Sequence, residues 1–132
     1  MKKETYLLDT HALIFWTNKV SVSEEFITFF DNQAKKGRLY VSSISFWEIA
    51  LLVKKDRISI SNVTAWKNEI INNTNIQMIE PSASEMIDST LLPDYHKDPF
   101  DRLLIAQANQ NNLLIVTKDS NIYKYKVETF WI

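Results

Sequence analysis

Residues 39–55, LYVSSISFWEIALLVKK, predict a short β-strand followed at once by an α-helix. The β-branched and aromatic run Leu39–Val41 is typical of a strand, and the apolar residues of 43–55 recur at helical spacing. Along the rest of the chain, short runs of the first kind alternate with longer helical stretches, without internal repeats or low-complexity segments. This alternation indicates an α/β fold whose sheet is mostly parallel.

The same two periods predict the remaining elements. Strands are expected at Tyr6–Leu8, Leu39–Val41, Ile76–Ile79, Leu113–Thr117 and Thr129–Ile132. Helices are expected at 10–18, 22–36, 43–55, 63–73, 83–90 and 99–111. A chain of 132 residues with 45% apolar content suits one compact core, so we expect residues 1–132 to form a single domain.

The composition excludes several functional classes. The chain has no cysteine, which excludes disulfides, thiolate metal sites and cysteine nucleophiles. Gly37 is its one glycine, whereas dinucleotide-binding turns and phosphate-binding loops need several. No apolar run is long enough to cross a bilayer, and Glu4 and Asp9 interrupt any signal-like N-terminal segment. We expect a cytoplasmic protein with no membrane partner, and a net charge of −1 limits nucleic-acid attraction to local basic clusters.

Glu48 is an acid inside an apolar helical run. A helical wheel places it on one face with Ile44, Trp47, Leu51 and Leu52, and we expect that face to pack on the sheet. Burying an isolated carboxylate costs several kcal/mol, against a net domain stability of roughly 5–15 kcal/mol. A buried salt bridge, a rim position that reaches water, or a functional site must therefore compensate the charge of Glu48.

Asp101 is a second acid at the head of an apolar helical stripe. In DPFDRLLIAQA, apolar residues follow it by three, four and seven positions. A structural role is open here, because an acid in the first turn of a helix suits the helix dipole. Asp98 precedes Pro99 and is a natural N-cap of the same helix. Capping explains Asp98, whereas Asp101 could serve the helix or a site.

Two more acids, Asp9 and Asp119, closely follow predicted strands. Either could merely cap a helix or a turn. In an open parallel sheet, however, strand ends and helix starts lie along one edge, where all four acids can converge. Carboxylates repel one another by roughly 1–4 kcal/mol per pair at about 4 Å, so a divalent cation would stabilise the group. Oxygen ligands favour Mg²⁺ or Mn²⁺, and such a site suits phosphodiester hydrolysis.

Four stretches stand out by their order and spacing: LLDTHALIFW, SSISFWEIALLVKKDRI, HKDPFDRLLIAQA and VTKDSNI. Together they resemble the motifs of PIN-domain ribonucleases, and most of all those of VapC-type toxins. The similarity runs from Leu7 to Trp131. The resemblance implies a PIN-like three-layer α/β/α sandwich with a central, mostly parallel sheet of about five short strands. It also implies an endoribonuclease that hydrolyses RNA through a bound Mg²⁺ or Mn²⁺ and an activated water.

The resemblance implies roles for the acids. Asp9 and Asp101 would be the firmest metal ligands, whereas Glu48 and Asp119 would complete the acidic pocket or bind a second ion. Asp98 competes for the third position, although Asp101 has the matching relation to the LLIAQA segment. The family also implies a hydroxyl near the first acid or after the fourth strand, for which the candidates are Thr10, Ser43 and Thr117.

Basic side chains flank the acids. Lys97, Arg102 and Lys118 could hold RNA phosphates, although solvated side chains with no ligand are an equal alternative. His11 and His96 also lie beside acids. Each could act as a base or a metal ligand, but lone histidines more often make structural hydrogen bonds.

The other face of the Glu48 helix is apolar as well, which indicates burial on both sides or cover by a partner. The resemblance implies such a partner, an antitoxin peptide that blocks the pocket, and it also implies a homodimer. Alternatively, a neighbouring helix such as 22–36 covers this face. The predicted groove residues are Phe15, Trp16, Phe46, Ile49, Ala50 and Val53.

The leading hypothesis is therefore an endoribonuclease toxin that a protein antitoxin inhibits. One alternative is a catalytically silent PIN-like binding module, which a metal titration would distinguish. Another is an acid-rich α/β phosphohydrolase acting on small phosphate esters, but that chemistry usually needs a DxD motif, and LDTHA holds one acid. The sequence contains no base-reading motif that identifies the RNA, and it does not fix the number of metal ions.

Overall fold

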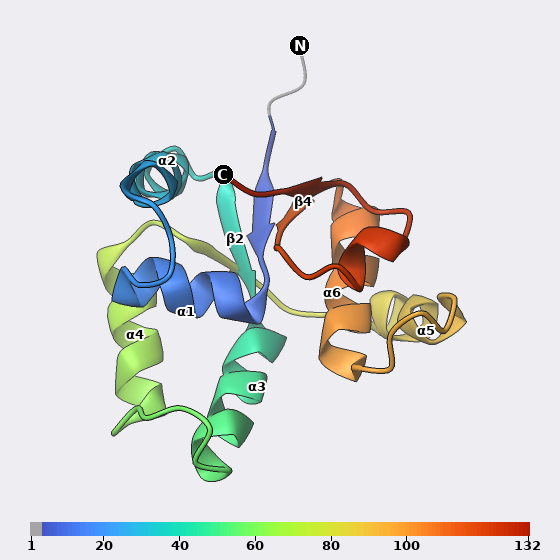
Figure 1. Cartoon of the computed structure of the whole chain (residues 1–132), viewed down its shortest axis with the longest axis horizontal. Coiled ribbons are helices and arrows are strands. Elements are labelled where there is room, and N and C mark those ends of the chain that lie inside the picture. Colours follow the sequence, from blue (N-terminus) through green and yellow to red (C-terminus); the bar gives the residue numbers. More distant parts are fainter. Residues whose placement is uncertain (1–3) are drawn as a thin grey trace.

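The computed structural model describes residues 4–132 and contains a five-stranded sheet covered by helices on both faces (Figure 1). Its strands are β1 (Tyr6–Leu8), β2 (Leu39–Ser42), β3 (Gln77–Ile79), β4 (Leu114–Val116) and β5 (Thr129–Phe130). Its helices are α1 (Thr10–Asn18), α2 (Glu24–Lys35), α3 (Ser43–Lys54), α4 (Val63–Asn73), α5 (Ala83–Leu91) and α6 (Pro99–Asn111). A short 3-10 helix, Ile122–Lys124, lies between β4 and β5. The predicted α/β sandwich is confirmed.

β1 is the central strand of the sheet, whose order is β3-β2-β1-β4-β5. Leu7 of β1 is in register with Tyr40 of β2 and with Ile115 of β4. All neighbouring pairs run parallel, so the carboxyl ends of β1, β2 and β4 lie side by side at one edge. The segments that follow these three strands therefore meet at this edge.

Alternate residues of the central strands face opposite helical layers. Leu8 and Val116 belong to one core with Phe30 of α2, and this core also includes residues of α1 and α4. Leu7 belongs to a second core with Leu104 of α6, and α5 packs against α6. Figure 1 shows α1, α2 and α4 on one side of the sheet and α5 and α6 on the other. No helix within residues 4–132 is both long and apolar enough to span a membrane.

An aromatic cluster joins the last strand to α2 and β1. The Phe130 ring stacks on Phe29 at a centroid distance of 5.2 Å and meets the Tyr6 ring edge-on at 5.1 Å. The Trp131 ring lies 4.9 Å from that of Phe26, which is fully buried. Each aromatic pair contributes roughly 0.5–1.5 kcal/mol beyond the area it buries. These contacts hold β5 beside β4 and fix the position of Trp131.

Side-chain caps determine where the helices begin, and they match the sequence interpretation. The bounds of α1, α4 and α6 are those predicted, and each end of the other helices lies within two residues of its prediction. Ser23 caps α2 by accepting from the Phe26 amide, and Asn62 caps α4 by accepting from the Ala65 amide. Three strands are shorter than predicted: β3 begins at Gln77, β4 covers only Leu114–Val116, and β5 ends at Phe130.

The face of α3 that packs against the protein differs from the prediction. Trp47 is 61% exposed, whereas Phe46 and Ile49 are buried. α4 covers this buried face, and the rings of Phe46 and Trp66 meet at 6.0 Å. Because α3 is apolar all round, its sequence period did not distinguish the two faces. Glu48 is consequently half-buried at the border of the packed face instead of at its centre.

The predicted partner groove is wrong for most of its residues. The core includes three of them, each at most 7% exposed: Trp16, Phe46 and Ile49. Val53 packs against that core, whereas Ala50 is exposed. The alternative in which a neighbouring helix covers this face of α3 is correct, but the helix is α4 and not 22–36.

Candidate active site

Asp9 lies at the carboxyl end of β1 and begins α1. Its Oδ1 accepts a hydrogen bond from the Ala12 amide at 2.7 Å, so the carboxylate caps the helix. Its own amide donates to the Val116 carbonyl at 3.1 Å, which ties it to the end of β4. The residue is only 6% exposed. The structural role considered for Asp9 is therefore present, and its charge also acts on Glu48 and Asp101.

Hydroxyl groups hold Glu48 in place. Thr10 Oγ1 donates to Glu48 Oε1 at 2.6 Å, and the same hydroxyl lies 3.1 Å from Ser45 Oγ. Thr10 is buried, so it fixes the carboxylate from inside the protein, and the buried Ser45 contacts the Thr10 hydroxyl. Ser45 and not the predicted Ser43 supplies the second hydroxyl of this network.

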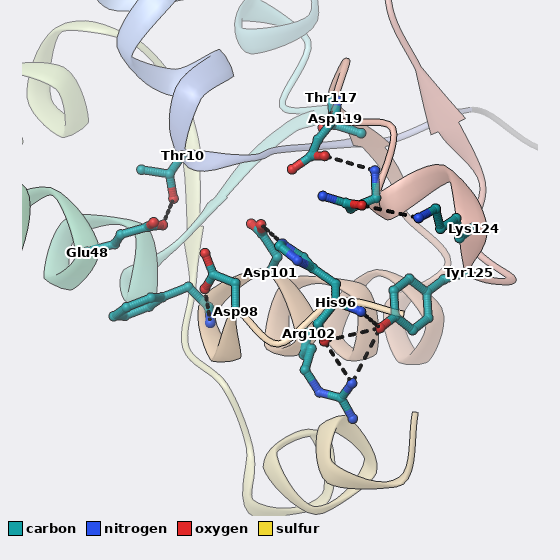
Figure 2. Close-up of polar contacts among 12 residues, drawn as sticks. Thr10, Glu48, His96, Asp98, Asp101, Arg102, Thr117, Asp119, Lys124 and Tyr125 are labelled. Atoms are coloured by element: carbon teal, nitrogen blue, oxygen red, sulfur yellow. Dashed lines mark hydrogen bonds and ion pairs between the residues drawn. The ribbon is translucent and has the colours of Figure 1, made fainter. Parts of the chain in front are cut away.

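His96, Asp98 and Asp101 form a compact group at the start of α6 (Figure 2). His96 Nε2 lies 2.8 Å from Asp101 Oδ2. Asp98 Oδ1 accepts a hydrogen bond from the Phe100 amide at 2.9 Å, which confirms the predicted N-cap. Ligand atoms of the three residues all lie within 4.8 Å of one another.

Asp119 lies in the loop between β4 and the 3-10 helix. Its Oδ1 accepts from the Asn121 amide at 2.9 Å, and its own amide donates to Thr117 Oγ1 at 3.1 Å. The Tyr123 hydroxyl donates to the Thr117 carbonyl at 2.9 Å and braces the same turn. Thr117 is fully buried, so it anchors the loop to the sheet.

The acids are crowded in a region that ranges from buried at Asp9 to partly exposed at Glu48, Asp101 and Asp119. Figure 2 shows Glu48, Asp101 and Asp119 projecting from three segments toward a common space. Burial raises the pKa of Asp101 to about 7; the hydrogen bond with His96 opposes this rise, and nearby carboxylates add to it. Burial also raises the pKa of Asp9 and Glu48, against the hydrogen bonds that both accept. Each of these three carboxylates is thus harder to ionise than in water.

The donor set fits a hard divalent cation, because carboxylate oxygens are the ligands that Mg²⁺ and Mn²⁺ prefer. Within residues 4–132, His96, Asp98 and Asp101 are the one group of such side chains whose ligand atoms lie within 4.8 Å of one another. The ligand atoms of Asp9, Glu48 and Asp101 do not all lie within that distance of one another. Repulsion between like charges favours this wider spacing. The chemistry matches the prediction. The closest spacing includes Asp98, which the sequence interpretation favoured as an N-cap while leaving it a competitor of Asp101 for the third acid position.

The predicted RNA-contacting residues lie in different surroundings. Lys97 and Lys118 are exposed. Lys97 lines a cavity of about 450 Å³ with Glu48, and Lys118 lines a cavity of about 250 Å³ with Asp119. Arg102 is only 9% exposed and makes its hydrogen bonds inside the protein, so its predicted RNA contact is wrong.

Arg102 anchors the loop that precedes α6. Its Nη1 donates to the carbonyls of Pro93 at 2.9 Å and His96 at 3.1 Å, and its Nη2 donates to the Leu92 carbonyl at 2.9 Å. The Tyr125 hydroxyl donates to the Pro93 carbonyl at 2.7 Å and lies 3.3 Å from Nη1. A buried guanidinium is tolerated where acceptors satisfy its donors, and here they fix the loop backbone at His96.

Sequence reasoning underestimated the contact that His96 makes with the site. The pattern H-x-D-x-x-D over residues 96–101 was the available signal. Pro99 starts the helix, so Asp101 projects from its first turn, and the loop before Asp98 folds back over that turn. Hydrogen bonds made by Arg102 produce this fold-back, and residue spacing does not encode them.

Comparisons with known proteins agree with this fold. The sequence profile described as PIN domain matches residues 6–128. Ribonuclease VapC22 of Mycobacterium tuberculosis is 29% identical over 126 residues, which cover 92% of each chain. VapBC2 of Rickettsia felis, bound to a promoter DNA fragment, has a TM-score of 0.73 at 19% identity, covering 96% of this chain and 98% of that chain. A toxin-antitoxin complex from Klebsiella pneumoniae has a TM-score of 0.61 at 18% identity, covering 90% of each.

Charge removal at Asp9 tests the crowding of the carboxylates. In metal-free buffer, Asp9→Asn is expected to leave the free energy of unfolding unchanged or to raise it by on the order of 1 kcal/mol. Asparagine keeps an N-cap oxygen and removes one repelling charge. Denaturant unfolding in EDTA measures the change, with Asp94→Asn as a control that removes a charge from a side chain 94% exposed. A clear loss of stability at Asp9 would show that its contacts need the charge.

Arg102→Gln tests the anchoring of the loop. We expect the free energy of unfolding to fall by about 2–4 kcal/mol, because three partly buried carbonyl oxygens lose a buried charged donor. The matched control Lys97→Gln removes an exposed cation from the same loop and should change stability by less than about 0.5 kcal/mol. Unfolding curves and RNA-binding titrations of both variants measure the effects. Unchanged stability with weakened RNA binding in Arg102→Gln would instead restore the predicted RNA contact.

Proposed function

This chain belongs to the PIN domain family, and on that premise we propose that it is a metal-dependent endoribonuclease, the toxin of a toxin–antitoxin pair. The relative from M. tuberculosis is named a ribonuclease, and one similar solved structure is a toxin-antitoxin complex. Because one fold supports many functions, the site must support the chemistry. The supporting observation is the group of crowded, partly buried acids at the carboxyl edge of the sheet.

The four acids would hold Mg²⁺ or Mn²⁺, with Asp9 and Asp101 as the firmest ligands. Glu48 and Asp119 would complete the pocket or hold a second ion. The bound ion would stabilise the charge that develops on the phosphate and lower the pKa of an attacking water. Asp98 lies close enough to Asp101 to contribute an oxygen as well.

Neighbouring side chains would keep these carboxylates in position. Thr10 holds Glu48 through its hydroxyl, and Thr117 fixes the turn after β4 that bears the fourth acid. His96 lies 2.8 Å from Asp101 and restricts the direction in which that carboxylate points. A site held by buried hydroxyls and a hydrogen-bonded ring needs little rearrangement when a ligand arrives.

The substrate would be RNA held by its phosphates. Lys97 and Lys118 are exposed, and each lines a cavity together with acids of the site. The Lys97 ammonium would hold a phosphate that flanks the cleaved bond, while Lys118 would contact the RNA from the other cavity. The long flexible lysine stems suit contacts with a mobile backbone, since they impose no fixed direction.

The proposed biological setting is a single PIN domain over residues 1–132, acting in the cytoplasm and held inactive by a protein antitoxin. We also propose that the protein forms a homodimer. The exposed apolar side chains of α5 support self-association, because Met86 is 50%, Ile87 60% and Leu91 75% exposed.

RNA cleavage tests the proposed chemistry. We expect the wild-type chain to cleave RNA with Mg²⁺ or Mn²⁺ and to stop in EDTA. Asp9→Asn and Asp101→Asn should each lower the rate by at least about a hundredfold, because each removes a charged ligand of the proposed metal ion. Gel assays on total RNA measure the rates, and Asp94→Asn is the matched control that should retain activity.

Two results of that assay would contradict the proposal. Cleavage that persists in EDTA, or in Asp9→Asn, would place the activity elsewhere. If the wild-type chain does not cleave and Mn²⁺ fails to raise its melting temperature, the silent binding module is correct. A wild type that hydrolyses small phosphate esters faster than RNA would favour the phosphohydrolase.

Growth arrest tests the antitoxin. Expression of the wild-type chain should stop growth, and co-expression of the adjacent small reading frame should restore it by forming an inhibited complex. The inactive Asp9→Asn chain is the control for expression burden. Growth arrest by that variant to the same extent would contradict a toxic ribonuclease activity.

A further inference from the structure

A cavity of about 250 Å³ opens directly beside the acids. Asp9 and Asp119 line one part of it, and the rest is formed by four side chains without a role in metal binding. Those four are His11, Phe15, Lys118 and Trp131. The cavity is therefore continuous with the acidic pocket but chemically different from it, since its walls are aromatic and basic.

Two aromatic rings turn their faces into this cavity. Lys118 Nζ lies 5.3 Å from the ring centroid of Phe15 and 5.4 Å from that of Trp131. An ammonium group reaches both centroids only if each ring has an open face on that side. Phe15 comes from α1 and Trp131 follows β5, so two segments distant in the sequence each supply one aromatic wall.

The Trp131 ring is held by a contact away from the cavity, whereas Phe15 lies beside His11, which also lines the cavity. Trp131 packs against the fully buried ring of Phe26 at 4.9 Å, and Phe15 lies one turn after His11 on α1, with ring centroids 6.2 Å apart. Lys118, by contrast, is exposed and has a long flexible stem. A flat ligand can therefore stack on the anchored Trp131 ring or on Phe15 while the lysine moves aside.

The charges around the cavity restrict its ligand. Asp9 and Asp119 at one end repel an anion. The Lys118 ammonium repels a second cation, but it can donate a hydrogen bond to a neutral acceptor. A neutral, planar group with an acceptor oxygen at its edge satisfies all three conditions. An unpaired nucleobase is such a group, and bases of single-stranded RNA are commonly bound by stacking on aromatic side chains.

We propose that this cavity is a base-binding subsite that holds one unpaired RNA base beside the cleaved bond and prefers guanine or uracil. The proposal rests on the proposed function for the identity of the polymer, since the acids that line the cavity also line the reaction site. The base preference follows from Lys118, which donates hydrogen bonds but accepts none. Guanine and uracil present a carbonyl oxygen where adenine and cytosine present an amino group.

Nucleoside binding tests the subsite without any cleavage. The chain has four tryptophans, and their indole N–H signals in a proton–nitrogen NMR spectrum report on four different places. In EDTA, added inosine or uridine should shift the Trp131 signal and leave those of Trp47 and Trp66 in place. Adenosine and cytidine carry an amino group in place of that carbonyl. They should bind about fivefold more weakly or worse, because the lysine and the amino group are both donors.

Variants separate stacking from base reading. Phe15→Leu should weaken all four nucleosides about fivefold or more, because one stacking face is lost. Lys118→Met should keep binding and abolish the difference between inosine and adenosine. Trp66→Leu, which removes an indole on α4, is the control. It should change neither the affinity for the nucleosides nor the difference between inosine and adenosine.

Three outcomes would overturn the subsite. The first is a Trp131 signal that does not move, or moves no more than those of Trp47 and Trp66. The second is equal binding of the keto and amino nucleosides by the wild-type chain. The third is a shift caused by methylguanidine but by no nucleoside, which would make the cavity a site for a basic side chain of a protein partner.

Sequencing the ends of cleaved RNA extends the test to the reaction. The base next to the wild-type cut should be enriched in guanine or uracil, and Phe15→Leu should lose that enrichment while still cutting. Cleavage without any base enrichment would overturn the subsite and leave the ribonuclease intact. Nucleoside binding by a chain that cuts no RNA would leave the subsite standing and overturn the proposed function.

Discussion

Repulsion among carboxylates at the carboxyl edge of the sheet is the constraint on which the rest of this structure depends. Parallel pairing of β1 with β2 and β4 brings together the segments that follow these three strands, and Asp9, Glu48 and Asp119 lie on those segments. Burial makes the charged forms of Asp9 and Glu48 costly. Local hydrogen bonds offset part of this cost, because the Ala12 amide donates to Asp9 and the Thr10 hydroxyl donates to Glu48. These donors favour the charged forms, so the group can remain anionic at a cost in stability.

The placement of Arg102 preserves that negative charge. It follows Asp101 directly in the chain, and a guanidinium turned toward the acids would neutralise them. Its donors go instead to backbone carbonyls, including those of Pro93 and His96. The carboxylate nearest to it is that of Asp94, 3.6 Å away and 94% exposed, where an ion pair contributes little. The cation therefore stabilises the loop through hydrogen bonds, and the acids keep their negative charge.

The fold and the acids could be predicted because they follow from local rules. Strand and helix periods fix the elements, and the end of a parallel strand fixes the edge at which Asp9 must lie. Side-chain direction does not follow from the same rules. α3 is apolar all round, so the exposure of Trp47 depends on where α4 packs. Neighbouring residues of an α-helix are rotated by about 100° around its axis, so the side chains of Asp101 and Arg102 point in different directions although they are adjacent in the chain. The contact of His96 depends in turn on that arginine.

The acids and the rim of the site depend on different parts of the molecule. Backbone register places most of the acids, since Asp9 lies at a strand end and Glu48 and Asp101 lie on the first turns of helices, while Asp119 lies in the loop after β4. Side chains from separate segments form the rim, for Phe15 comes from α1, Lys118 follows β4 and Trp131 follows β5. A substitution at the rim alters the surface that meets the substrate but leaves the strand ends in register. Substrate choice in this fold can therefore diverge without moving the acids, because the two properties depend on separate sets of contacts.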